Sequence, residues 1–166
     1  EELAHQVLTL YRLNDPAKGT TVNVGVIRGG SRSNVVADQA DMEVDVRVSS
    51  VEDGERLNAL VQGLKPKVSR ASLEITGGIN RPPLERTPII VALFERARAL
   101  AAEIGIKLTE GETGGGSDGS FTAALGIPTL DGLGPDGAGP HALHGHVLVV
   151  SLVPRAALLT QLVLKL

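Results

Sequence analysis

The chain has 166 residues and a formal net charge of −3. Basic and acidic residues are interspersed, without the basic stripe that a phosphate backbone requires, so we expect no nucleic-acid partner. Hydrophobic residues make up 42% of the sequence and aromatic residues only 2%, which predicts a packed core of Val, Leu, Ile and Ala and excludes a disordered chain.

The absence of cysteine excludes a disulfide framework, a thiolate metal site and a cysteine nucleophile. It fits a cytoplasmic protein, which we expect, although a periplasmic enzyme can also lack cysteine. The longest apolar stretch, residues 146–166, is interrupted by Ser151, Pro154, Arg155 and Lys165 and is too broken to span a bilayer. We therefore expect no membrane partner.

A helix is predicted over residues 1–13, where Leu3, Val7, Leu10 and Tyr11 recur at helical spacing. The first residue is not Met, and no Ser, Thr, Asp or Asn precedes the helix as a cap. The simplest expectation is that a part of the protein precedes this helix.

Two strands are predicted over residues 21–27 and 42–48, because valine or methionine alternates there with polar residues. This pattern indicates one dry and one wet face, most simply in an antiparallel pair. A helix follows, for which either Ser49 or Ser50 can be the cap, and Glu52 completes a capping box with Ser49. Residues 73–75 are expected to form a further short strand.

This order predicts an α+β layer, with a small antiparallel sheet covered on one face by two helices. One more strand before the first helix would give the ferredoxin-like βαββαβ order. Pro82 and Pro83 mark a boundary, so we expect one domain over residues 1–83, incomplete at its N-terminus, and another over residues 84–166.

The second domain is predicted to be α/β. Thr87 and Pro88 are typical of a helix start, and Gly105 of its end. Short strands are expected over residues 106–108 and 127–130. A short helix between them would be capped by Ser117 and stopped by Gly126, and residues 152–166 would form a closing amphipathic helix.

Gly114, Gly115 and Gly116 form a run that allows three interpretations. It can be a flexible loop, a phosphate loop, or a loop whose backbone faces a substrate or an oxyanion beside a metal. The Gly-Lys-Ser/Thr ending and the dinucleotide spacing are both absent, which disfavours the phosphate loop. Glycines alone do not decide among the other two.

Three of the four histidines, His141, His144 and His146, lie close together in the sequence. They lack the spacing of a helical His-Glu-x-x-His pair. They can form a mononuclear three-histidine site, or provide one ligand with two bystanders. Asn34 and Arg81 are polar residues at corners of the chain, where a satisfied turn is the simplest interpretation.

The ordered set of motifs resembles the dinuclear zinc carboxypeptidase and deacylase family, which includes glutamate carboxypeptidase, acetylornithine deacetylase and succinyl-diaminopimelate desuccinylase. Residues 19–27 with Asn34, and the Asp45-Val46-Arg47 step, resemble the family's lid domain. Residues 113–118, Gly139 with His141, and residues 151–155 resemble the end of its catalytic domain. The resemblance runs through nearly the whole chain in the family's order, and its glutamate carboxypeptidase branch is the most similar.

This resemblance implies a C-terminal portion of a zinc-dependent amide hydrolase whose substrate bears a free carboxylate, with two zinc ions in the complete enzyme. It implies that His141 is a zinc ligand and that Asn34 and Arg81 reach the substrate carboxylate and the oxyanion. It further implies a homodimer formed through the lid. The residues with implied roles in the wall of the substrate pocket are Gly114, Gly115 and Gly116.

The family's other zinc ligands and its general-base glutamate match no residue of this chain, so no catalytic residue is assigned and we expect the chain alone to be inactive. His144 and Gly145 stand where the family often has an acidic residue. The competing hypotheses are a non-enzymatic module that dimerises or binds a peptide, and the mononuclear three-histidine site.

Overall fold

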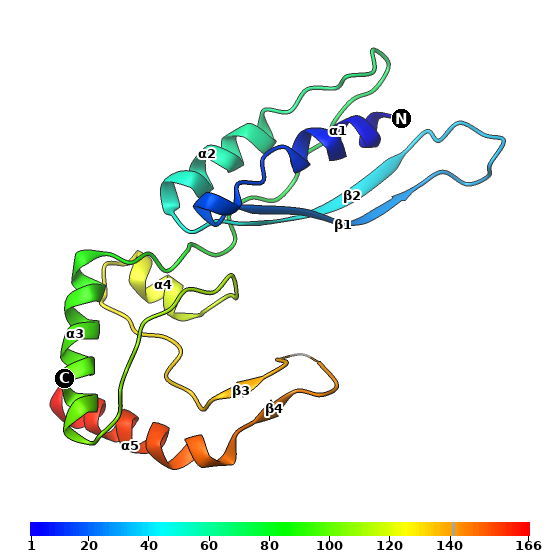
Figure 1. Cartoon of the computed structure of the whole chain (residues 1–166). Coiled ribbons are helices and arrows are strands. Elements are labelled where there is room, and N and C mark those ends of the chain that lie inside the picture. The colour runs from blue at the N-terminus through cyan, green and yellow to red at the C-terminus, as the bar shows by residue number, and fades with distance from the viewer. Residues whose placement is uncertain (141) are drawn as a thin grey trace. The chain divides into compact units, whose positions relative to one another are not determined.

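The computed structural model describes residues 1–140 and 142–166, and it divides into two compact units. The first unit comprises Glu1–Glu85 together with Gly114–Gly116, and the second comprises Arg86–Thr113 and Ser117–Leu166. Helices and small two-stranded sheets give an α+β fold, which confirms the expected class at that level (Figure 1). Among the described residues, no helix is long and apolar enough to cross a membrane.

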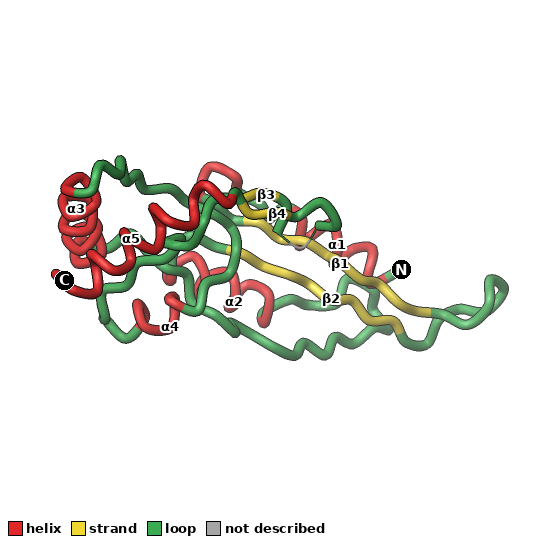
Figure 2. Tube along the Cα trace, turned by 90° about the horizontal axis from the view of Figure 1, so that it is seen from below, coloured by secondary structure: helices red, strands yellow, loops and turns green. Residues whose placement is uncertain are grey.

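The first unit contains an antiparallel hairpin with helices α1 and α2 on one of its faces (Figure 1). The pairing of β1 with β2 runs from Thr21 opposite Arg47 to Gly29 opposite Ala40, and Figure 2 shows the two strands side by side. The predicted first helix and the predicted strand pair are confirmed. The elements are α1 (Glu2–Tyr11), a 3-10 turn η1 (Pro16–Lys18), β1 (Thr21–Gly29), β2 (Ala40–Arg47) and α2 (Val51–Gln62).

A bulge interrupts the hairpin between Val24 and Val26. Val24 lies opposite Val44, but Val26 lies opposite Glu43, because one extra residue on β1 shifts the alternation of its side chains. The expected alternation is nevertheless kept in the burial of β1, where Val22 is buried and Val24 and Val26 are half-buried. Ile27 lies opposite Met42 and is 55% exposed.

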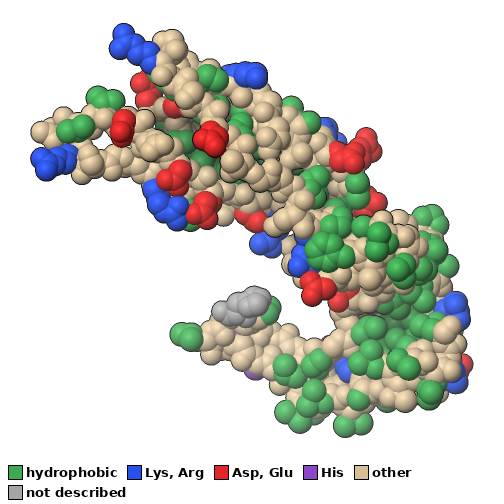
Figure 3. Space-filling view, turned by 180° about the vertical axis from the view of Figure 1, so that it is seen from behind, with side chains coloured by type: hydrophobic (Ala, Val, Ile, Leu, Met, Phe, Trp, Pro, Cys, Tyr) green, Lys and Arg blue, Asp and Glu red, His purple; other side chains and the backbone are tan. Residues whose placement is uncertain are grey.

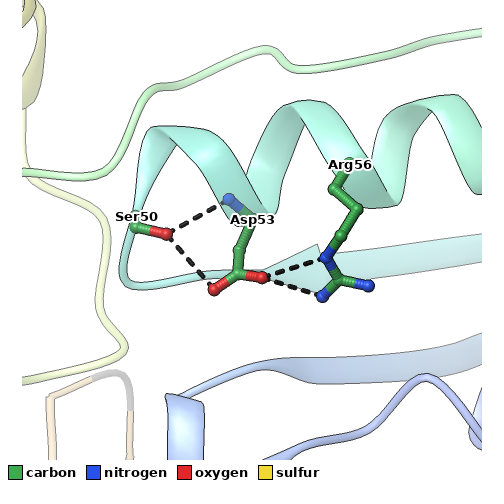
Figure 4. A network of polar contacts seen from close by, with 3 residues as sticks. All are labelled: Ser50, Asp53 and Arg56. Carbon is green, nitrogen blue, oxygen red and sulfur yellow. Dashed lines mark hydrogen bonds and ion pairs between the residues drawn. The ribbon is translucent and has the colours of Figure 1, made fainter.

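Helix α2 begins after Ser50, whose side-chain oxygen accepts a hydrogen bond from the backbone N–H of Asp53 at 3.1 Å (Figure 4). The Asp53 carboxylate also accepts from the Arg56 guanidinium at 2.8 Å, which lowers the pKa of Asp53. The capping box expected from Ser49 and Glu52 was wrong by one residue. Because Ser50 has the extended backbone that a cap requires, it caps the helix.

Backbone segments of the first unit are tied together by polar side chains. Asn14 accepts from the N–H of Val22 at 2.9 Å and donates to its carbonyl at 3.1 Å, as a neighbouring strand would. Glu2 accepts the N–H groups of Lys67 and Val68 at 3.0 and 2.8 Å. Hydrogen bonds from the Gln6 side chain and from these amides lower the pKa of Glu2. These contacts fix the loop after α2 against the start of α1.

The second unit packs α3 against α5. Thr87 caps α3, as predicted, and its hydroxyl oxygen lies 3.5 Å from the backbone nitrogen of Ile90. Gly105 follows the end of the helix, also as predicted, and has a positive φ of 75°. Ala97, Ala101, Leu158 and Leu162 are the buried centre of the core. The elements are α3 (Pro88–Glu103), α4 (Gly119–Ala124), β3 (Gly137–Ala138), β4 (His146–Val147) and α5 (Val149–Lys165).

Three expected strands are not formed, and this corrects the prediction of an α/β arrangement. Residues 73–75, 106–108 and 127–130 have no ladder partner among the described residues. Short apolar segments become strands only where another strand accepts their hydrogen bonds. Ile106 and Leu108 pack their side chains against the α3–α5 core instead.

Helix α5 begins at Val149, three residues before the expected start. Apolar side chains gather on the surface of the second unit (Figure 3). Several belong to α5, where Val150 is 84% exposed and Val163 is 83% exposed. One side of α5 therefore packs on α3 while apolar residues of another side face solvent.

Candidate substrate-binding site

The glycine run and Arg81 lie together in the first unit. A Cβ atom placed on Gly116 would be 3.5 Å from both the Cδ and the Nε atom of Arg81, so the arginine side chain lies against the bare backbone of the run. Glycine leaves this approach open. The structure thus brings together two of the features to which the sequence assigned substrate binding.

Arg47 also reaches the run, and sequence reasoning did not assign it to the site. Its Nη1 atom donates to the carbonyl oxygen of Gly114 at 2.8 Å, and its Nε atom donates to Asp45 at 2.8 Å. The alternation of charged residues places Arg47 on the polar face of β2. Nothing in that pattern shows contact with a residue 67 positions later.

Asn34 is exposed in the loop between β1 and β2, at the end of the hairpin away from Arg47. The eight residues of β2 separate these two ends. At a rise of about 3.3 Å per residue, this distance is roughly 25 Å. The structure therefore does not bring Asn34 to Arg81 within one chain.

His141, the expected metal ligand, lies outside the described residues. His144 and His146 are both exposed. The His144 ring packs on Gly139, where an added Cβ atom would come within 2.9 Å of Cδ2, and Gly139 has a φ of 66°. The Nδ1 atom of His146 is 3.1 Å from the carbonyl of His144.

The base of the β3–β4 hairpin is fixed to α5 by a group of polar contacts. The Ser151 hydroxyl accepts the N–H of Asp136 at 2.9 Å and donates to the carbonyl of Leu148 at 2.6 Å. Arg155 donates to the Asp136 carboxylate at 2.7 Å. Residues 151–155, part of the motif set, thus hold the base of the sheet formed by β3 and β4.

The described residues do not form a metal site. They contain no group of three or more His, Asp or Glu side chains that could hold an ion. A zinc ion bound by protein alone needs about four ligands, or three with one water. The mononuclear three-histidine hypothesis has no described cluster in its favour.

A separate hollow lies in the second unit. It has a volume of about 650 Å³ and lies along α3 and the segment after it, with Phe94 and Arg98 on one wall. Beside it, Arg86 and Glu110 form an ion pair at 2.9 Å, which raises the pKa of Arg86 and lowers that of Glu110. None of the described residues that were assigned to substrate binding lines this hollow.

Residues 1–70 match the family of peptidase dimerisation domains. Among curated proteins, carboxypeptidase G2 from Pseudomonas sp. strain RS-16 is 27% identical over 157 residues, which cover 93% of this chain and 38% of that protein. N-acetyldiaminopimelate deacetylase from Halalkalibacterium halodurans is 36% identical over 55 residues, 31% of this chain and 15% of that protein. The chain spans little more than a third of the length of carboxypeptidase G2.

A solved structure shares the fold. Aminopeptidase PepT from Bacillus cereus ATCC 10987 superposes with a TM-score of 0.53 over 86% of this chain and 39% of its own. The sequence identity is 22%, so this likeness concerns the fold alone.

Proposed function

The chain belongs to the M20 family of peptidases and deacylases, and from this premise we propose that it is part of a metal-dependent amide hydrolase of the glutamate carboxypeptidase kind. The observation that carries the proposal is the convergence of Arg81 on the glycine run of the first unit. A guanidinium beside bare backbone suits a substrate that ends in a carboxylate.

Arg81 is proposed to bind the substrate carboxylate or the developing oxyanion through its forked, permanently charged guanidinium. Gly114, Gly115 and Gly116 are proposed to form the wall of the pocket, where the absence of side chains lets the substrate approach the backbone. The complete enzyme would hold two zinc ions, and His141 would be one of the zinc ligands. When bound, such ions polarise a carbonyl and lower the pKa of water.

Residues 1–83 are proposed to be a lid and dimerisation domain of ferredoxin-like plan, and residues 84–166 the last part of the catalytic domain. The match of residues 1–70 to peptidase dimerisation domains supports a homodimer. The surface of this dimer would be a lid helix and the edge of its sheet, because an unpaired edge strand invites pairing.

Asn34 remains a proposed substrate contact. Because β2 separates its loop from Arg47 and Arg81, a pocket that contains both Asn34 and Arg81 would take Asn34 from a second copy of the chain. This contact depends on the proposed homodimer.

The role of Arg81 is tested in the complete protein with amides that end in glutamate. We expect Arg81→Ala to lower kcat/KM about 100-fold, which corresponds to roughly 2.7 kcal/mol of lost transition-state stabilisation. Arg81→Lys should recover only part of this, because an ammonium cannot bind a carboxylate in a forked manner. Equal activity of wild type and Arg81→Ala on all such amides would contradict the proposal.

Measuring the zinc content of the 166-residue chain distinguishes the proposed function from the hypothesis of a mononuclear three-histidine site. We expect less than stoichiometric zinc on this chain. Stoichiometric zinc that is lost in His144→Ala or His146→Ala would favour the three-histidine site instead.

A further inference from the structure

We propose that Arg47 is a positioning residue, which holds the run Gly114–Gly116 so that Arg81 and the run present one surface to a carboxylate. This inference rests on the proposed function, because it takes the run as the wall of a substrate pocket. It adds a residue to which neither the sequence nor the comparisons gave a role.

Arg47 is well placed to act as an anchor. It is the last residue of β2 and lies opposite Thr21 at the end of a ladder that fixes its backbone. Asp45 lies two residues earlier on the same face and accepts from the Nε atom at 2.8 Å, which orients the guanidinium. The Nη1 atom can then donate to Gly114 from a rigid strand rather than from a loop.

The glycine run needs such an anchor. Fixing the backbone of one residue costs about 1–2 kcal/mol of conformational entropy, and glycine loses more freedom than any other residue. A Cβ atom placed on Gly114 would meet no described atom within 4 Å, so no side chain packs on that side of this residue. Arg81 lies against the other end, at Gly116.

Arg47 and Arg81 therefore have different roles. Arg47 directs its Nη1 atom to a backbone carbonyl of the run and its Nε atom to Asp45, so under this proposal it acts on the ligand through the glycine run. Arg81 lies across the run and is the direct carboxylate partner under the proposed function. Loss of Arg47 should release the run and weaken carboxylate binding while Arg81 is still present.

The test uses the full chain with isotope-labelled glycine, and L-glutamate is the probe. Backbone order at Gly115 and Gly116 is measured by heteronuclear NOE without ligand, and glutamate affinity by the shifts of the same amides. We expect Arg47→Ala to lower the order of the run and to weaken glutamate binding about fivefold, the size expected for the net contribution of one ordinary hydrogen bond.

Two variants serve as controls. Arg28→Ala removes a β1 arginine of similar exposure, 60% against 55% for Arg47, whose ion pairs are with Asp41 and Glu43. It should leave the run unchanged. Arg47→Lys keeps one donor for the Gly114 carbonyl but not the fork that also reaches Asp45, so it should restore part of the order and affinity.

The outcomes separate the two proposals. If Arg81→Ala weakens glutamate binding while Arg47→Ala changes neither order nor affinity, the positioning role is overturned and the proposed function stands. If Arg47→Ala disorders the run but wild type and Arg81→Ala bind glutamate equally or not at all, the anchor is real and the proposed pocket fails.

Discussion

The two units of this chain are stabilised by different means. In the first, β1 and β2 pair from end to end except at the bulge, and the side chains of Asn14 and Glu2 bind backbone segments directly. In the second, an apolar core is buried between α3 and α5, and residues 106–108 and 127–130 have no strand ladder. The difference teaches that strand pairing and side-chain bonds to the backbone add to the packing of Leu10, Val22 and Leu57 in the first unit, whereas helix packing dominates the described contacts of the second. It suggests substitutions that separate these contributions.

The largest effect is expected in the core of the second unit. Leu158 is fully buried, so Leu158→Ala should lower the free energy of unfolding of that unit by about 3 kcal/mol through lost burial and a cavity. Hydrogen exchange should show faster opening of α3 and α5. Leu164→Ala is the control, because Leu164 lies on the same helix and is 76% exposed. Equal effects of the two substitutions would contradict the packing account.

In the first unit, Asn14→Ala is expected to cost about 2 kcal/mol, because it leaves the backbone N–H and carbonyl of the buried residue Val22 without these partners. Denaturant unfolding measures the loss. Asn14→Asp keeps the acceptor for the Val22 N–H and loses the donor to the carbonyl, so it should fall between wild type and Asn14→Ala. A neutral Asn14→Ala would show that the side chain does not complete the strand.

Removing the N-cap residue of one helix in each unit allows a direct comparison of the stability that each cap contributes. Ser50→Ala and Thr87→Ala should each lower the free energy of unfolding by about 1 kcal/mol. Ser50 should be the larger effect, because its hydroxyl is 3.1 Å from the capped N–H and that of Thr87 is 3.5 Å away. Ser50→Thr and Thr87→Ser keep the hydroxyl and should retain most of the stability in the same denaturation assay. A larger loss in Thr87→Ala would contradict this order.

The smallest effect concerns pH. The pKa of Glu2 is lowered in the folded chain, so its contribution to stability is fully present above its ordinary pKa and is lost as the pH falls through the folded value. Glu2→Gln should therefore flatten the decline of the urea midpoint between about pH 6 and pH 3. Glu1→Gln removes a charge at the same helix end, where no side-chain cap forms, and should leave the decline as steep as in wild type. An unchanged slope in Glu2→Gln would remove Glu2 as a source of acid sensitivity.

The sequence predicts best those parts of the fold whose partners are near in the chain. The hairpin needs only two alternating segments joined by a loop, and α3 has a cap and a proline at its start and Gly105 at its end. The segments 73–75, 106–108 and 127–130 were predicted as strands from composition, but composition does not show whether a ladder partner exists. The bulge was missed because Gly25 lies within an otherwise regular alternation.

The site could be predicted only in part, for a similar reason. Arg81 and Gly116 could be named from the resemblance, but only the structure shows that they touch. The contact of Arg47 with Gly114 depends on a loop 67 residues away, which no local pattern reveals. The distance of Asn34 from that contact follows from the length of β2, whereas the resemblance implied that Asn34, Arg81 and the glycine run all contact the substrate.

The central claim is that this chain is the lid and the last catalytic portion of a metal-dependent hydrolase. The most direct measurement is the hydrolysis of a glutamate-terminated amide by the complete protein with zinc, with a chelator, and after zinc is restored, beside the 166-residue chain alone. The account predicts hydrolysis only by the complete protein, lost on chelation and recovered with zinc. Undiminished hydrolysis by the fully chelated protein, or hydrolysis by the 166-residue chain alone, would contradict it.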